Sequence, residues 1–228
     1  MEPTSEEGER TSNHDRVWKL ASLLGAVGSV GAFLLVLLLQ RGFEGRVAYL
    51  MVGESIARVG YGLVLLPVAI YVTITTWLGL RGNLVTTREA YLSPGLWRVQ
   101  HGARGAAALL AAGPLLVLLL GSMAGSDPAA LYDRLRIDLG RPLVLLVVLA
   151  GLSATAFVIG QGVPAFHKIW TGRPARAPAP RLLGVAAGVL FWLLSVNVVG
   201  YYSTGRALVG GQGAPAVEGP KGVEGSEP

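Results

Sequence analysis

The chain has 228 residues, of which 52% are hydrophobic and 14% charged, and its formal net charge is +5. This balance is typical of a membrane bundle with short connections rather than of a soluble domain. The sequence has no cysteine, which excludes disulfides, thiolate metal ligands, iron–sulfur clusters and a cysteine nucleophile. Its Lys and Arg residues lie between apolar runs rather than in a block with aromatic residues, so nucleic-acid binding is not expected.

The first apolar run, Trp18–Leu39, follows an acidic start, MEPTSEEGER. It is longer than the apolar part of a secretory signal, so we expect an uncleaved first membrane span. Residues 1–16 should form a disordered acidic tail. Residues 17–206 should form the membrane domain.

Four further apolar runs are each close to the about 20 residues that a helix needs to cross the hydrocarbon. Lipid cannot satisfy free backbone polar groups, and no run alternates with a period of two, so we expect helices rather than a barrel. The sequence therefore predicts an all-α fold, a polytopic membrane bundle of five transmembrane helices. The four further runs are Val59–Leu80, Val99–Gly121, Pro142–Phe166 and Leu182–Tyr202.

The connection between the third and fourth runs is SMAGSDPAALYDRLRIDLGRP. Ser126 and Asp127 are N-cap candidates before Pro128 at the first helical position, and apolar residues follow among charges. This pattern predicts a short amphipathic helix on the outer membrane surface. After the fifth run, residues 207–228 are rich in Gly, Pro and Glu and should form a disordered tail.

Basic residues set the expected orientation. More Lys and Arg residues lie on the N-terminal side of the spans than on the opposite side, which favours a cytoplasmic N-terminus and an outer C-terminus. Arg greatly outnumbers Lys, and Ala, Gly and Pro are abundant, as in GC-rich bacterial genes. We therefore expect a multi-pass protein of a bacterial inner membrane.

Small residues recur at helical spacing in several runs, among them Gly25, Gly28 and Gly31 in the first and Gly184 and Gly188 in the last. They allow close approach of helix backbones in lipid. The partner helix belongs either to this chain or to another subunit.

Glu54 and Arg58 lie in VAYLMVGESIARVGYG, which leads into the second run. Their spacing lets them form an ion pair on one helix face. Charges near hydrocarbon indicate a functional site, here a proton, quinone or partner contact. The alternative is a structural ion pair just below the outer interface that reaches water.

His101 opens the third run and His167 closes the fourth. Consecutive spans are antiparallel, so both imidazoles should lie at the same membrane face, as bis-His ligation of a b-type haem iron requires. Arg98, Arg104 and Lys168 are candidates to bind its propionates. Alternatively, both histidines are interfacial side chains among lipid headgroups.

Five spans, a cytoplasmic N-terminus and His near helix ends resemble the single-polypeptide cytochrome b anchors of succinate dehydrogenase and fumarate reductase. The resemblance is one of architecture, and it implies a haem b and quinone anchor of a respiratory complex. That family supplies four axial histidines for two haems. This sequence has two histidines in or near spans, His101 and His167, so it does not support a two-haem site.

No HExxH, paired-Asp or phosphate-loop motif occurs, so no catalytic residue is predicted. The leading hypothesis is a non-enzymatic inner-membrane subunit or scaffold that packs with lipid and with partner membrane proteins or further copies of itself. The first alternative is the haem or quinone anchor. The second is a small transporter that uses Glu54, Arg58 and the Thr-rich second run.

Overall fold

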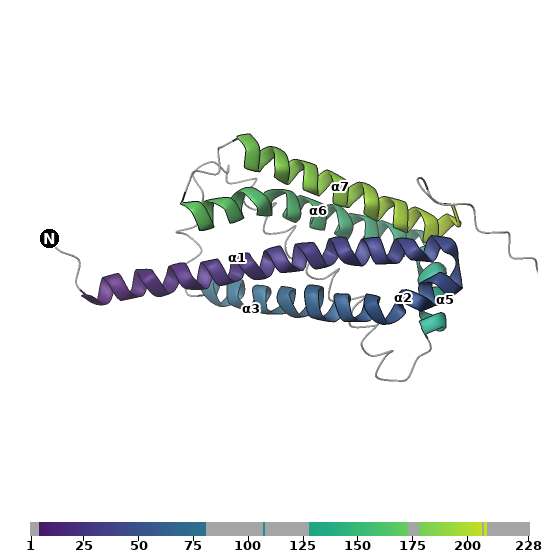
Figure 1. Ribbon diagram of the computed structural model, residues 1–228, viewed down its shortest axis with the longest axis horizontal. Coiled ribbons are helices and arrows are strands. Elements are labelled where there is room, and N and C mark those ends of the chain that lie inside the picture. The colour runs from purple at the N-terminus through teal and green to yellow at the C-terminus, as the bar shows by residue number, and fades with distance from the viewer. Residues whose placement is uncertain (1–4, 81–106, 108–127, 173–177, 207, 209–228) are drawn as a thin grey trace, which may run out of the picture.

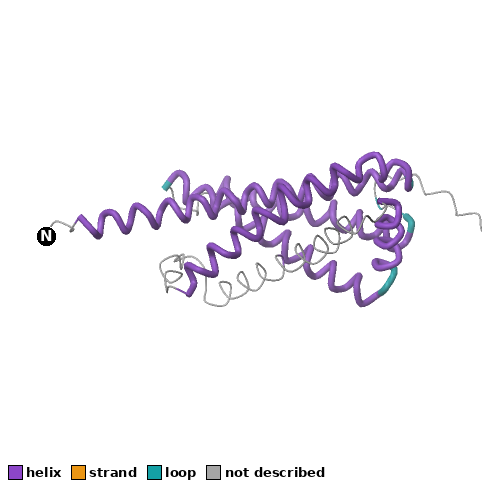
Figure 2. Tube along the Cα trace, turned by 90° about the horizontal axis from the view of Figure 1, so that it is seen from below, coloured by secondary structure: helices purple, strands orange, loops and turns teal. Residues whose placement is uncertain are grey.

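A computed structural model describes residues 5–80, 107, 128–172, 178–206 and 208. The regular structure of these residues is entirely helical (Figures 1 and 2). The long helices run along the length of the molecule, and one short helix lies at one end (Figure 1). The α-helices are α1 (Ser5–Leu39), α2 (Arg46–Val59), α3 (Leu66–Leu80), α5 (Pro128–Leu139), α6 (Pro142–Thr171) and α7 (Pro178–Thr204).

Helix α1 ends at Leu39, where the first span was predicted to end, but it begins at Ser5, inside the segment assigned to an N-terminal tail. A 3-10 helix, η1 (Gln40–Glu44), follows α1. The chain then reverses into α2 at Gly45, whose φ of 107° favours glycine.

Helices α2 and α3 are joined by a π-helical segment, η2 (Gly60–Leu65), with no break between them. The second span was predicted to start at Val59, but the helix starts at Arg46. No proline interrupts residues 46–59, so nothing in the sequence ends the helix earlier. Glu54 and Arg58 consequently lie in regular helix ahead of the predicted span.

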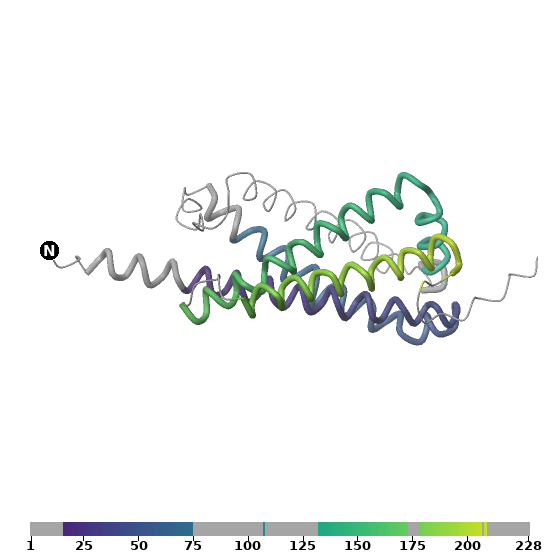
Figure 3. Tube along the Cα trace, turned by 90° about the horizontal axis from the view of Figure 1, so that it is seen from above, coloured from purple at the N-terminus to yellow at the C-terminus, as the bar shows by residue number. Residues whose placement is uncertain are grey.

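Helices α6 and α7 form a closely packed antiparallel hairpin (Figure 3). Gly184 and Gly188 of α7, which were predicted to allow close helix approach, lie against the backbone of α6. A Cβ added to Gly188 would lie 2.7 Å from the carbonyl oxygen of Ala156, and one added to Gly184 would overlap the carbonyl oxygen of Gly160. Close approach through small residues is therefore confirmed here, and the partner helix belongs to this chain.

Helix α1 packs against α3 on one side and α6 on the other. Gly31 of α1 lies directly on the backbone of Leu63 in η2, and Gly28 contacts Val68 of α3. Residue numbers rise along α1 as they fall along α3, so these contacts define an antiparallel register.

Within the described residues, four helices are long and apolar enough to cross a membrane. They cover the first, second, fourth and fifth predicted runs. Apart from Ala107, the third run, Val99–Gly121, lies outside the described residues. Helix α5 begins at Pro128, which confirms a short helix between the third and fourth runs. The four apolar helices are Arg16–Glu44, Arg46–Ile74, Pro142–Thr171 and Pro178–Thr204.

Candidate functional site

Five buried aromatic residues from four elements form a cluster, which we call the aromatic cap, at the end of the molecule where α5 lies (Figure 1). The rings of Tyr132 lie 5.1 Å from Tyr49 and 5.7 Å from Tyr202, measured between centroids. The short helix α5 is therefore held to the ends of α2 and α7 by its own tyrosine. The cap consists of Phe43, Tyr49, Tyr132, Tyr201 and Tyr202.

Tyrosine hydroxyls of the cap donate to carbonyl oxygens at and just after the end of α1. Tyr202 donates to the carbonyl of Leu39 at 3.1 Å, and Tyr201 to that of Phe43 at 3.4 Å. Leu39 is the N-cap of η1 and Phe43 lies within it, so these two bonds attach α7 to the junction of α1 and η1. An ion pair of 3.2 Å between Arg46 and Asp133 further joins α2 to α5. The aromatic cap therefore has a structural role, which is to hold these elements together at one end of the bundle.

The structure brings Glu54 and Arg58 together in an ion pair of 2.5 Å on α2. The side chains are 78% and 77% exposed, so they face away from the bundle. Because Gly31 lies against Leu63, Glu54 is level with Gln40, each about nine residues or about 14 Å of helix from that contact. The pair therefore lies at the end of the bundle that carries the aromatic cap.

His167 is half-buried in the last turn of α6, where its carbonyl oxygen accepts a 2.7 Å hydrogen bond from Thr171. His101, Arg98 and Arg104 lie outside the described residues, so the pairing of the two imidazoles remains a prediction. Among the residues described, no group of three or more His, Asp or Glu side chains is placed to hold a metal ion.

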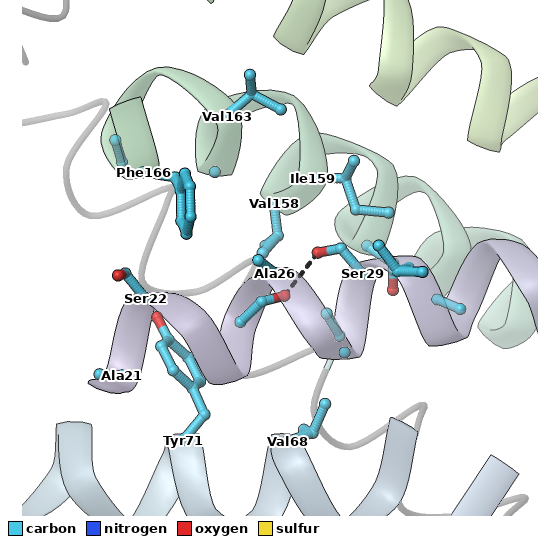
Figure 4. A pocket seen from close by; sticks show the side chains of 18 of the residues that line it. Ala21, Ser22, Ala26, Ser29, Val68, Tyr71, Val158, Ile159, Val163 and Phe166 are labelled. Carbon is cyan, nitrogen blue, oxygen red and sulfur yellow. Dashed lines mark hydrogen bonds between the residues drawn. The ribbon is translucent and has the colours of Figure 1, made fainter. Parts of the chain in front are cut away.

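A cavity of about 430 Å³ lies along α1 between α3 and α6. Figure 4 shows Tyr71 and Val68 of α3 reaching toward α1, and Val158 and Phe166 of α6 on the opposite side. Ala107 also lines it. We call this cavity the groove, and α1, α3 and α6 supply most of its lining among the described residues.

The cavity lining is almost wholly apolar, and two of its hydroxyl groups bond to carbonyls of their own helices. Ser29 donates to the carbonyl of Gly25 at 2.8 Å (Figure 4), and Thr155 donates to that of Gly151 at 2.9 Å. Near the N-terminal part of α1, the indole nitrogen of Trp170 donates to Ser22 at 3.0 Å. The groove therefore suits an apolar occupant rather than a charged substrate.

Sequence reasoning did not find the groove or the aromatic cap. The small residues of the first run were the one signal for the groove. The cap had only a weak signal, aromatic residues near span ends. No protein-family model, curated protein or solved structure matches this chain. Fold and geometry define a helical protein whose helices are compatible with a membrane.

Proposed function

We propose that this chain is a non-enzymatic subunit of a bacterial inner membrane that binds a partner membrane protein through an outward helix face. The observation that carries the membrane assignment is the outer face of α7, where six large apolar side chains are 52–68% exposed. A soluble monomer rarely exposes so much contiguous apolar surface, whereas lipid covers it at no cost. These side chains are Leu182, Leu183, Val185, Val189, Leu190 and Leu193.

The partner site in this proposal is the outer face of α2. Val47 and Met51 are 68% and 81% exposed and lie in one stripe with the Glu54–Arg58 pair. Unlike the outer face of α7, this stripe combines apolar side chains with an ion pair. Such a mixture suits a protein interface with a polar rim, where charges add specificity, better than it suits lipid tails.

In the same proposal the cap end faces the outside, and α5 lies in the outer interface. Tyrosines are enriched at the headgroup level, which supports this position for the aromatic cap. The N-terminus is then cytoplasmic, as the distribution of basic residues predicts.

Site-specific photo-crosslinking in native membranes tests the partner site. A photoreactive residue at Met51 should give one discrete protein adduct, and the adduct should disappear when Glu54→Gln and Arg58→Gln are added. The same residue at Leu190 on α7 is the matched control and should give lipid adducts alone. An adduct of twice the chain mass at Met51 would identify the partner as a second copy. Lipid adducts alone at both positions would refute the proposal.

A further inference from the structure

We propose that the groove holds one acyl chain of an anionic phospholipid, whose phosphate is bound by Lys19 of α1 and Lys168 of α6. The inference rests on the membrane assignment of the proposed function, but it does not require the partner site on α2. The ligand is a lipid of stated charge at one defined place, which distinguishes it from the bulk lipid around the outer helix faces.

The groove has the length and the volume of a site for a hydrocarbon chain. On α1 its lining extends from Trp18 to Phe33, which is about 22 Å of helix, whereas one leaflet of hydrocarbon is about 15 Å deep. Its volume of about 430 Å³ lies within the range of about 300–1,000 Å³ that is typical of small-molecule sites. An apolar chain in the groove gives its walls dispersion contacts that a void cannot supply.

One end of the groove adjoins the surface of the bundle. Trp18 and Ser22 line the groove there (Figure 4 shows Ser22), and the indole nitrogen of Trp170 donates to the Ser22 hydroxyl at 3.0 Å. Trp170 is 48% exposed, so this hydrogen bond lies where the groove meets the outside. Tryptophan side chains concentrate at the headgroup level of a membrane. A chain that enters the groove at this end therefore keeps its headgroup at the interface.

Two lysines flank this end of the groove. Lys19 lies three residues before Ser22, whose hydroxyl donates to the Lys19 carbonyl at 2.8 Å, and Lys168 lies two residues before Trp170. Because Ser22 and Trp170 are hydrogen-bonded, the two lysines extend from neighbouring points on α1 and α6. Ammonium groups bind phosphate as point charges. Each has three donors, so a lysine can bind a phosphate oxygen beside another partner.

The charges of the two ends support an anionic headgroup at the lysines. All four carboxylates whose side chains the structure describes lie at the cap end, each in an ion pair with an arginine. The side chains described at the opposite end include Arg16, Lys19 and Lys168 and no carboxylate. Basic side chains between membrane helices are a recurrent binding site for anionic lipid headgroups. The four carboxylates are Glu44, Glu54, Asp133 and Asp138.

Native mass spectrometry of the purified full chain tests the proposal. The anionic probe is palmitoyl-oleoyl phosphatidylglycerol, and phosphatidylethanolamine with the same chains is the zwitterionic comparison. Lys19→Gln and Lys168→Gln each remove one charge beside the groove, and Arg206→Gln, just after α7 at the cap end, is the matched control. Ala26→Leu fills part of the groove, and Ala186→Leu, exposed on α7, is its control.

We expect the wild-type protein to retain several-fold more phosphatidylglycerol than phosphatidylethanolamine. Lys19→Gln and Lys168→Gln should each lower this ratio several-fold, and Arg206→Gln should leave it unchanged. Ala26→Leu should reduce retention of both lipids because it takes volume from the acyl chain, whereas Ala186→Leu should not.

Equal retention of the two lipids by the wild-type protein would overturn the proposal, and so would equal effects of Arg206→Gln and the two lysine variants. A co-purified isoprenoid quinone that Ala26→Leu removes and phosphatidylglycerol does not displace would assign the groove to a quinone instead. A discrete protein adduct at Met51 together with equal retention of both lipids would refute this lipid site and leave the proposed function standing.

Discussion

The hydroxyl of Tyr202 distinguishes two kinds of tyrosine within the aromatic cap. It donates to the carbonyl of Leu39, at the end of α1, and the residue is 1% exposed. Tyr49 is similarly buried, at 4%, but its hydroxyl has no hydrogen bond within the described residues. The same substitution at the two positions therefore separates hydrogen bonding from ring packing.

We predict that Tyr202→Phe lowers the free energy of unfolding by about 1 kcal/mol, because it removes a hydrogen bond that a buried side chain donates. Tyr49→Phe should change it by a few tenths of a kcal/mol at most. Thermal unfolding of the purified protein in mild detergent measures both variants. Equal losses would show that the Tyr202 hydroxyl does not hold the end of α1.

The haem hypothesis depends on two individual residues, His101 and His167. It expects a b-type band in the reduced-minus-oxidised spectrum of protein from haem-replete cells, and loss of the band in both His101→Ala and His167→Ala. His14→Ala, in the N-terminal region, is the control and should keep the band. Absence of any band from the wild-type protein would refute the haem hypothesis.

At the scale of elements, the α6–α7 hairpin depends on glycines that let two backbones meet. Gly184 has no room for a Cβ, whereas a Cβ at Gly200, on the same helix, would meet nothing within 4 Å. Burial of a methyl group against backbone cannot be relieved by a side-chain rotation.

We predict that Gly184→Ala lowers the free energy of unfolding by about 1–3 kcal/mol, because the helices must move apart. Gly200→Ala should be neutral or stabilising by up to about 1 kcal/mol, since alanine favours helix. Detergent melting curves of the two single variants give the comparison. A Gly184→Ala protein as stable as the wild type would mean that the backbones of α6 and α7 are not in contact at Gly184.

The elements differ in how well the sequence predicted them. The end of α1 and the starts of α5 and α6 follow from a change in hydropathy and from Pro128 and Pro142 at first helical positions. The second span was predicted to start at Val59, 13 residues after the start of α2 at Arg46, because a charged, amphipathic helix continues directly into the apolar run. The π-helical segment has no local sequence signal of its own.

The candidate sites likewise divide into contacts set by spacing within one helix and contacts set by tertiary packing. The Glu54–Arg58 contact was predictable because it depends on spacing within one helix. The aromatic cap was not, because Tyr49, Tyr132 and Tyr202 come from helices far apart in sequence. Their contact depends on the tertiary arrangement alone.

At the scale of the whole molecule, aromatic side chains mark both ends of the bundle. Trp18 and Trp170 lie near the N-terminal part of α1, and the tyrosines of the aromatic cap lie at the opposite end. Tryptophan and tyrosine concentrate at the two interfaces of a membrane, one on each side of the hydrocarbon. This arrangement supports the proposal that the helices cross a bilayer along their common axis.

Labelling of single cysteines by a membrane-impermeant maleimide tests this central claim most directly. In intact cells, Glu44→Cys at the cap end should react. Thr171→Cys, at the opposite end of α6, should react only after the cells are permeabilised. Leu190→Cys, on the outer face of α7, should stay unreactive in both cases because hydrocarbon covers it. Equal reaction of all three positions in permeabilised cells, Leu190→Cys included, would contradict the account.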